Sequence, residues 1–424
     1  MPHSFVVILG KAVRYAARLR GGGSALPGLF VEKIDPDFIK KTLAQLPKGI
    51  VIISGTNGKT TTTKMVVALL EAHGLKVFTN RTGSNFSRGV AAALLGDIDI
   101  KGNLDADIAV LELDEAHAVH FVASIPPRYS LILNVMRDQL DRFGEIDATA
   151  KMLEKIAIST TGSVVLNRED TRIRAIEKIL DTQSVSYFGL SDDLLATFPS
   201  DDDMRSLTIK KTTRPKADVT LTSYDDTLAT YTIDGHDSIT TTLKISGLYN
   251  VFNSAAAIAL VKTVLDEDFS VAKTKESIAT VTPAFGRGET IEVGGQPLEL
   301  VLVKNPSGFR LGLKSFSPEG YATMIAVNDN YADGRDMSWL WDVDFESLSE
   351  LGVSEVSGVR AYDMALRLQY DEVPIGKIDT DLASALRDFI ENNKNVPKRI
   401  YCTYTAMLGL RRELAKITDV EVVS

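Results

Sequence analysis

Residues 49–70 read GIVIISGTNGKTTTTKMVVALL. The β-branched run Ile50–Ile53 predicts a buried strand, Gly55–Gly58 predict a tight turn, and the apolar pattern after Lys59 predicts a helix. This order builds a cradle for phosphate, because glycines let the backbone approach an anion and the N–H groups that open the helix point at it. The stretch therefore predicts a nucleotide site on a parallel α/β sheet.

The loop is a shortened form of the usual phosphate-binding motif, since Ile53 stands where G-x-x-x-x-G-K-[ST] has its first glycine. Lys59 supplies a point charge for the outer phosphates, and the Thr60 hydroxyl is a ligand for Mg²⁺. The residues predicted to hold the nucleotide are Gly55, Thr56, Asn57, Gly58, Lys59, Thr60 and Thr61.

Composition narrows the class of protein. A chain of 424 residues is too long for one ordinary hydrophobic core, so two or three domains are expected. Its formal net charge of −9 argues against a nucleic-acid partner. The single cysteine, Cys402, excludes a disulfide framework or a four-cysteine zinc site within one chain and fits a reducing cytoplasm. No apolar run approaches the roughly 18 residues of a membrane span, so none is expected.

The segment before the phosphate loop predicts an amphipathic helix followed by the glycines Gly21–Gly23. We favour a helix docked on its own domain; the alternative is a peripheral helix whose cations rest on anionic lipid at the inner face of the membrane. The cations are Lys11, Arg14 and Arg18, and the apolar face predicted to pack is Phe5, Ile8, Leu9, Ala12, Val13, Ala16 and Leu19.

Strands and helices alternate along most of the chain, which predicts a parallel sheet with helices on both faces. The texture changes to alternating Thr, Ser and β-branched residues in about 201–245, which predicts a small antiparallel insert. A Pro/Gly-containing turn near 282–288 marks the expected start of a second α/β domain. We therefore expect three parts: 1–33, 34–281 and 282–424.

The strand that begins at Ile108 ends in three carboxylates, Glu112, Asp114 and Glu115. In a phosphate-loop sheet, an acid at the carboxyl end of a neighbouring strand holds Mg²⁺ against the phosphates. Glu112 is the candidate for this role. For Asp114 and Glu115, metal binding and solvated charge remain equal alternatives.

Three more residues are predicted to touch the nucleotide. Asn250 and Asn253 lie one turn apart at a helix start; an N-cap explains one of them, whereas a side-chain amide also suits an adenine edge. Arg287 lies in a glycine turn at the predicted domain boundary, where an arginine can clamp phosphate.

Residues 327–342, VNDNYADGRDMSWLWD, combine carboxylates with both tryptophans after a predicted strand. Such a loop suits a functional surface, or a turn whose tryptophans fill the core. His117 and His120 are interpreted as a packed helix face and Cys402 as a structural residue.

The phosphate loop, the strand ending in Leu-Glu-Leu-Asp-Glu (111–115) and Gly-x-x-Asn-x-x-Asn-x-Ala-Ala (247–256), in this order, resemble the Mur ligase family. Within it the chain is similar to the MurT subfamily, the synthetase subunits of lipid II isoglutaminyl synthase. The matching stretches run nearly end to end: 20–28, 80–85, 137–142, 331–342 and 404–408.

This resemblance implies a Mur-type ATP-binding domain, a C-terminal Rossmann-like domain, and ATP with Mg²⁺ as cofactors. It implies amidation of the D-glutamate α-carboxylate of the lipid II stem peptide through an acyl phosphate, in peptidoglycan biosynthesis. Ammonia would come from a GatD-like glutaminase subunit, bound through the C-terminal domain. Asp336, with Asp342 and Asp333 behind it, is expected to complete the catalytic triad of that partner.

Two departures from the family pattern change the expected metals. The insert has no cysteine, so the zinc ribbon of several relatives is not expected. Asp138-Gln139-Leu140-Asp141 is followed by Leu153 where many Mur ligases have a carbamylated lysine, which puts a second Mg²⁺ in doubt.

Two other functions fit parts of the sequence. A stand-alone Mur-like or folylpolyglutamate-like ligase would add an amino acid without a partner. A non-catalytic scaffold would keep nucleotide as a structural ligand, but the intact Lys59, Thr60 and Glu112 argue against it.

Overall fold

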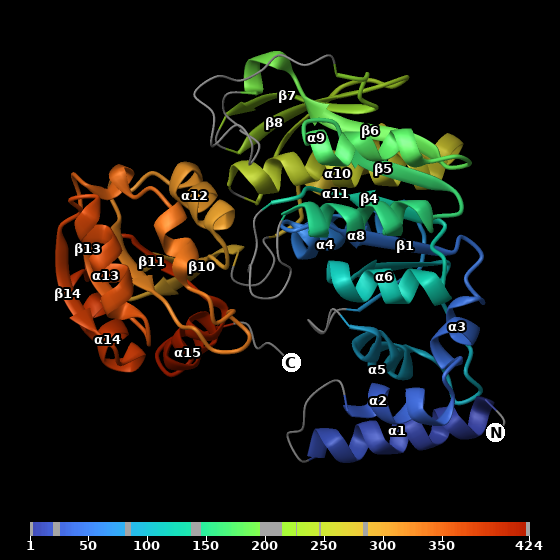
Figure 1. Ribbon diagram of the computed structural model, residues 1–424, viewed down its shortest axis with the longest axis horizontal. Coiled ribbons are helices and arrows are strands. Elements are labelled where there is room, and N and C mark those ends of the chain that lie inside the picture. Colours follow the sequence, from blue (N-terminus) through green and yellow to red (C-terminus); the bar gives the residue numbers. More distant parts are fainter. Residues whose placement is uncertain are drawn as a thin grey trace. The chain divides into compact units, whose positions relative to one another are not determined.

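The computed structural model describes residues 3–19, 26–80, 86–136, 146–195, 214–225, 227–245, 247–282 and 287–420. The chain forms two compact units, shown in Figure 1. Unit 1 contains residues 1–135, 147–244 and 250–281, and unit 2 contains 136–146, 245–249 and 282–424.

Unit 1 is built on a nine-stranded sheet of order β2-β3-β1-β4-β5-β6-β7-β8-β9. The strands from β2 to β7 are parallel, as the sequence predicts, and β8 and β9 are antiparallel to their neighbours. The sheet is doubly wound about β1, whose neighbours are β3 on one side and β4 on the other. Ligands bind at the carboxyl ends of strands at such a point. The strands are β1 (Ile50–Ser54), β2 (Val77–Thr79), β3 (Ile108–Glu112), β4 (Tyr129–Ile132), β5 (Ser163–Asn167), β6 (Ser184–Leu190), β7 (Val219–Asp225), β8 (Leu228–Ile233) and β9 (Ile239–Thr242).

Helices cover this sheet, and the most buried of them is α10. Among the described residues, one helical stretch, Leu248–Asp268, is long and apolar enough to cross a membrane, but 72% of its apolar window is buried in the structure. The other helices of unit 1 are α1 (His3–Leu19), α2 (Leu26–Ile34), α3 (Phe38–Leu43), α4 (Lys59–Ala72), α5 (Ser87–Asp97), α6 (Glu115–Ser124), α8 (Ile146–Ile158), α9 (Thr171–Ala175) and α11 (Val271–Ile278), with α10 at Leu248–Leu265 and the 3₁₀ turns η1 (Ile176–Ile179), η2 (Asp192–Leu194) and η4 (Asp266–Asp268).

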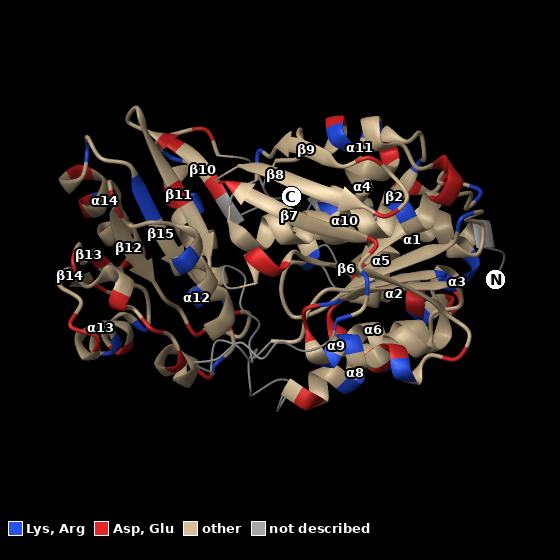
Figure 2. Ribbon diagram, turned by 90° about the horizontal axis from the view of Figure 1, so that it is seen from above, with Lys and Arg blue, Asp and Glu red and all other residues tan. Residues whose placement is uncertain are grey.

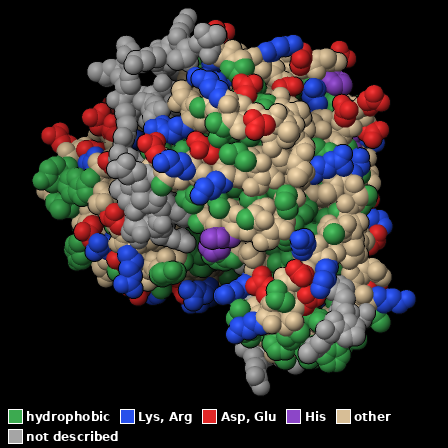
Figure 3. All heavy atoms as spheres, turned by 45° about the vertical axis from the view of Figure 1, so that its right-hand side comes forward, with side chains coloured by type: hydrophobic (Ala, Val, Ile, Leu, Met, Phe, Trp, Pro, Cys, Tyr) green, Lys and Arg blue, Asp and Glu red, His purple; other side chains and the backbone are tan. Residues whose placement is uncertain are grey.

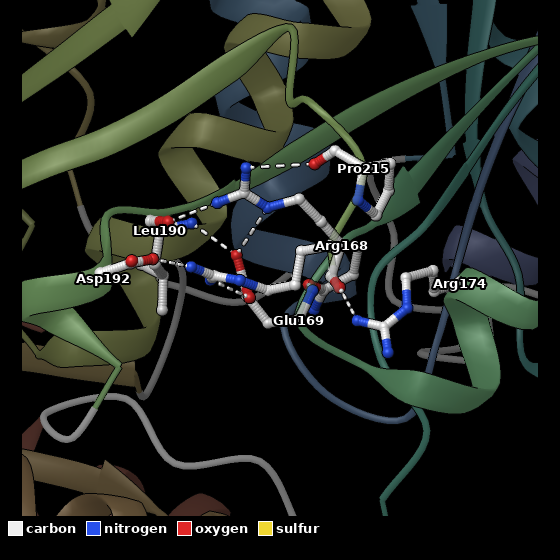
Figure 4. A network of polar contacts seen from close by, with 8 residues as sticks. Arg168, Glu169, Arg174, Leu190, Asp192 and Pro215 are labelled. Atoms are coloured by element: carbon white, nitrogen blue, oxygen red, sulfur yellow. Dashed lines mark hydrogen bonds and ion pairs between the residues drawn. The ribbon is translucent and has the colours of Figure 1, made fainter. Parts of the chain in front are cut away.

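The β-rich insert is part of the main sheet. Its strands are antiparallel to one another, as predicted, but β7 pairs in parallel with β6, so they extend the sheet. Figure 4 shows the polar network at this junction. Arg168 donates to Pro215 O (3.3 Å), to Leu190 O and to Glu169 Oε1 (3.0 Å), and Arg214 donates to Glu169 Oε2 (2.6 Å) and to Asp192. The start of the insert is therefore tied to the main sheet by the buried Arg168 and the partly buried Arg214.

Helix α1 packs against α2 and α5, so the predicted docking on its own domain is confirmed. The prediction of which face packs is wrong. Val6, Val7 and Ala17 are buried, whereas Phe5 and Ile8 are exposed. The helix carries two apolar stripes, and Gly10 lies on the packed side: a Cβ at Gly10 would lie 2.6 Å from Val31 Cγ2, so a larger residue there would force neighbouring side chains to shift. The N-terminal segment is thus integrated into unit 1.

Unit 2 is a second α/β layer structure, with sheet order β10-β11-β15-β12-β13-β14. All pairs are parallel except β10 with β11. One core cluster lies on the side of Phe309 and Trp339, and another contains Leu386, Phe389 and Cys402. Its strands are β10 (Arg287–Val293), β11 (Gln296–Leu302), β12 (Ala322–Ala326), β13 (Val353–Ser357), β14 (Ile375–Asp379) and β15 (Lys398–Cys402); its helices are α12 (Pro306–Ser315), α13 (Ala361–Tyr370), α14 (Leu382–Asn392) and α15 (Tyr404–Leu414), with η5 (Ser338–Asp342) and η6 (Glu346–Leu348).

The expected α/β class, a parallel sheet with a β-rich insert and a second α/β unit, is confirmed. Figure 2 shows acidic and basic residues interspersed over the outer elements of both units.

Candidate functional site

The phosphate loop connects β1 to α4 at the winding point of the unit 1 sheet. Gly55 (φ 138°) and Gly58 (φ 89°) adopt conformations that L side chains avoid, which explains why glycine occupies both positions. Gly58 is the N-cap of α4, and its carbonyl accepts the first helical hydrogen bond, from Thr62 N at 2.9 Å. The N-terminus of a 14-residue helix is therefore presented directly after the loop, as a phosphate site requires.

Lys59 folds back over this loop. Its Nζ donates to Gly55 O at 2.5 Å and to Glu115 Oε1 at 3.2 Å, and both side chains are almost fully buried. A buried ammonium needs a counter-charge, and Glu115 provides it. The sequence left Glu115 open between metal binding and solvated charge; in the structure it orients the lysine. The neighbouring Asp114 caps α6 by accepting from Ala116 N.

Thr60 and Glu112 meet at the carboxyl ends of β1 and β3. Thr60 Oγ1 donates to Glu112 Oε1 at 2.7 Å. Asn80 fixes the glutamate from behind, because its amide donates to Glu112 O (2.8 Å) and accepts from Glu112 N (3.0 Å). Two hard oxygen donors are thus placed side by side next to the phosphate loop. Among the described residues, no group of three or more His, Cys, Asp or Glu is arranged to hold a metal ion.

Asn134 is a site residue that the sequence interpretation missed. Its side chain accepts from Asn57 N and donates to Asn57 O, both at 2.9 Å, and its carbonyl accepts from Thr56 N at 3.1 Å. These bonds clamp the middle of the phosphate loop to the end of β4. The available signal was position, since Asn134 follows a buried strand just as the acids after Ile108 do.

The two asparagines of α10 differ in their surroundings. Asn253 is buried, and a Cβ on Gly58 would lie 2.3 Å from its Nδ2, so the amide packs directly against the phosphate loop. Asn250 is half-buried one turn earlier on the same helix. The structure brings Asn253 to the loop and leaves the contact of Asn250 with a nucleotide as a prediction.

The carboxylate-rich loop of unit 2 follows β12, where the strand order reverses between β12 and β15. Asn328 ties it to the segment after β13 and to the start of α15, accepting from Val359 N (3.0 Å) and donating to Thr405 Oγ1 (3.1 Å). Asp333 is an internal brace, because its oxygens accept from Thr405 N (2.7 Å) and Thr405 Oγ1 (2.5 Å). Burial raises the pKa of Asp333.

Asp336 differs from Asp333 in exposure and in the direction in which its pKa is shifted. It is half-exposed, and hydrogen bonds from Ser338 hold its pKa below the usual value; Ser338 N donates to Asp336 Oδ1 at 2.9 Å. Oδ2, the other carboxylate oxygen of Asp336, belongs to this partly exposed side chain. Asp342, at the end of η5, is also half-buried. Asp333 is therefore buried, whereas Asp336 and Asp342 are exposed enough for another molecule to reach them.

The two tryptophans divide the roles that sequence left open. Trp339 is 6% exposed and packs in the core near Phe309. Trp341 is 49% exposed and makes an edge contact with Tyr370 on α13, with ring centroids 5.0 Å apart. The loop thus fills the core with one indole and presents the other at the surface.

The remaining predicted residues have simple placements. Arg287 was expected in a turn, but its backbone begins β10. Cys402 is fully buried at the end of β15, and burial raises the pKa of its thiol, which fits a structural residue. His117 makes an edge contact with Phe86. Leu153 is buried in α8, where a lysine was the family expectation. Residues 137–142 lie outside the described residues.

Comparisons with known proteins agree with both units. The profile of the Mur ligase middle domain matches residues 53–261, and that of the MurT ligase C-terminal region matches 302–407. MurF from Acinetobacter baumannii superposes with a TM-score of 0.69 at 18% identity, covering 92% of this chain and 80% of MurF. Folylpolyglutamate synthase from Mycobacterium tuberculosis gives 0.62 at 16%, covering 90% and 93%. The fold is that of the Mur ligases.

One relative narrows the assignment further. The MurT subunit of the glutamine-hydrolysing lipid II isoglutaminyl synthase from Streptococcus pneumoniae is 32% identical, over 96% of each chain. The chain therefore belongs to the MurT family of Mur ligases.

Proposed function

We propose that this chain is the synthetase subunit of a lipid II isoglutaminyl synthase. The observation that carries the proposal is the loop geometry: Lys59 is aimed over the phosphate loop by Glu115, and Thr60 meets Glu112 beside it. ATP would phosphorylate the D-glutamate α-carboxylate of the stem peptide, giving an acyl phosphate and ADP. Ammonia would then attack the acyl carbon and release phosphate, which leaves the amide of D-isoglutamine.

Each residue of the loop has a stated part in this reaction. The Lys59 ammonium stabilises negative charge on the transferring phosphoryl group, and Glu115 keeps that ammonium in place. The helix N-terminus and the clamp from Asn134 hold the loop backbone ready for phosphate without rearrangement. Two solved relatives support ATP as the phosphate donor by their bound nucleotides: the Thermotoga maritima MurF ligase with ADP and the M. tuberculosis synthase with ADP and AMPPCP.

The Thr60 hydroxyl and the Glu112 carboxylate fit Mg²⁺, because both are hard oxygen donors and they lie 2.7 Å apart. When bound, the ion would neutralise charge on the phosphate oxygens. The buried Leu153 offers no ligand for a second ion in the position that many Mur ligases give to a lysine.

Ammonia would come from a GatD-like glutaminase subunit. The relative from S. pneumoniae is named as one subunit of a glutamine-hydrolysing enzyme, which supports a partner. Glutamine hydrolysis of this type needs a reactive cysteine, and Cys402 is buried with a raised thiol pKa. We assign Asp336 to the partner's Cys–His pair: the low pKa keeps its carboxylate ionised, so that it can orient an imidazole. The exposed Trp341 supplies an anchor of the kind found at interfaces.

The decisive experiment supplies lipid II, ATP and ammonium to the chain without a partner. Formation of isoglutamine, lost in Lys59→Ala, is the expected result. No amidation under these conditions would overturn the proposal. ATP turnover that depends instead on a free amino acid would favour the stand-alone ligase.

A further inference from the structure

Helix α1 presents an apolar stripe to solvent. Phe5, Ile8 and Tyr15 are 52%, 56% and 68% exposed, and the small residues Ala12 and Ala16 are exposed between and beside them. Their spacing of 3, 4, 3 and 1 residues places them on one side of an α-helix. Figure 3 shows hydrophobic side chains at the lower edge of the molecule, where α1 and α2 lie in Figure 1.

The orientation of this stripe is fixed by the packing of the opposite face. Val6 and Val7 are buried against the unit, and Gly10 lets α1 approach Val31 and Leu95 closely. Lys11 points inward and donates from Nζ to Ile98 O at 2.7 Å. Rotation of α1 to hide the outer stripe would break these contacts, so the stripe is a stable surface.

Lys11 and Arg14, the cations of α1 whose side chains the structure describes, both contact the protein. Lys11 is bonded to the end of α5, and the Arg14 guanidinium lies close to Gly96, since a Cβ there would be 2.3 Å from Arg14 Nη1. Among the described side chains of α1, the outward face therefore offers apolar and aromatic area, and neither Lys11 nor Arg14 belongs to it. Such a face suits the boundary between lipid headgroups and acyl chains better than an anionic surface.

We propose that the outward face of α1, formed by Phe5, Ile8, Ala12, Tyr15 and Ala16, docks on the membrane by apolar insertion. The occupant is a lipid surface because the proposed substrate is lipid-linked; the inference rests on the proposed function in this respect. Contact along one short helix gives weak, reversible association, which keeps the enzyme near its substrate. Binding by insertion predicts little dependence on anionic lipid or on salt.

Vesicle flotation of the full chain tests this surface. Vesicles of pure phosphatidylcholine should bind the protein at both 0.1 and 0.5 M NaCl, and Ile8→Asp should lower the partition coefficient by about tenfold. Tyr15→Asp should act in the same direction. The matched control is Leu366→Asp, an aliphatic residue that is 50% exposed on α13 in unit 2, which should bind like the parent. Thermal melting verifies that each variant is folded.

Several outcomes would overturn the proposal. Unchanged vesicle binding in folded Ile8→Asp and Tyr15→Asp would remove α1 from the contact. Binding that requires phosphatidylglycerol and disappears at 0.5 M NaCl would show an electrostatic contact instead. A parent dimer that dissociates in Ile8→Asp, with no vesicle binding, would identify a second copy as the occupant. Ammonium-driven amidation of detergent-solubilised lipid II should be retained in Ile8→Asp; its absence from the parent would refute the proposed function and leave the vesicle result standing.

Discussion

The phosphate loop of unit 1 and the carboxylate loop of unit 2 both lie at the carboxyl ends of parallel strands, but they differ in how their polar groups are satisfied. Around the phosphate loop the charges are buried and paired within the chain, as Lys59 with Glu115 shows. In unit 2, Asp333 is paired internally while Asp336 and Trp341 remain accessible. The first arrangement is preorganised by contacts within the chain. The second presents groups that suit completion by another protein.

The largest effect is expected where the phosphate loop of unit 1 loses the positive charge of Lys59. Lys59→Ala should lower ammonium-driven amidation by about a thousandfold, because the charge proposed to face the transferring phosphoryl group is lost and Glu115 is left buried without its cation. The measurement is isoglutamine formation at saturating ammonium. Lys64→Ala, an exposed lysine on the same helix, is the control and should keep nearly full activity. A comparable loss of amidation in both variants would mean that the substitutions act by destabilising α4.

Asp336→Asn should separate the two loops functionally. With the GatD-like partner present, glutamine-driven amidation should fall by about a hundredfold or more, since an amide cannot stabilise an imidazolium. Ammonium-driven amidation should stay within about twofold, because the phosphate loop does not use this residue.

Asp333→Asn provides the contrast for this experiment. Asp333 braces the loop through Thr405, so its substitution should lower the melting temperature as well as glutamine-driven activity. Equal loss of both activities in Asp336→Asn, or full glutamine-driven activity, would remove Asp336 from the partner's triad; Asp342→Asn would then be the next variant to measure.

Gly58→Ala tests how tightly the unit 1 site is packed. Alanine at φ 89° is strained by about 1–2 kcal/mol, and its Cβ would also lie 2.3 Å from Asn253 Nδ2. We expect roughly tenfold weaker ATP binding by calorimetry. Gly74→Ala is a matched control, because Gly74 has φ 95° and no atom within 4 Å of an added Cβ. This variant should lower the free energy of unfolding through backbone strain but should leave ATP binding unchanged. Equal ATP affinity in the two variants would show that the contact between the added Cβ and Asn253 does not weaken ATP binding.

The sequence predicted features that depend on local order and left open those that depend on packing. The strand, turn and helix of residues 50–72 follow from one continuous pattern, and the position of Glu112 follows from its strand. The clamp by Asn134 depends on β4 lying beside β1, which spacing does not reveal. Helix α1 has two apolar stripes, so periodicity alone could not tell that Val6 faces inward and Ile8 outward. The different fates of Trp339 and Trp341 have the same origin, because identical side chains two residues apart are distinguished only by the surrounding core.

The smallest effect on activity is expected at Cys402, and it bears on the proposal that a partner subunit hydrolyses glutamine. Burial raises the pKa of this thiol, so at pH 7–8 the reactive thiolate is strongly disfavoured in the folded protein. Iodoacetamide should label Cys402 only after unfolding, as measured by mass spectrometry with and without urea. Cys402→Ala should leave both ammonium-driven and glutamine-driven amidation within about twofold, while creating a small cavity beside Val301 that lowers the melting temperature. Selective loss of glutamine-driven activity in this variant would mean that the chain supplies its own nucleophile, and the accessible Asp336 would then require another explanation.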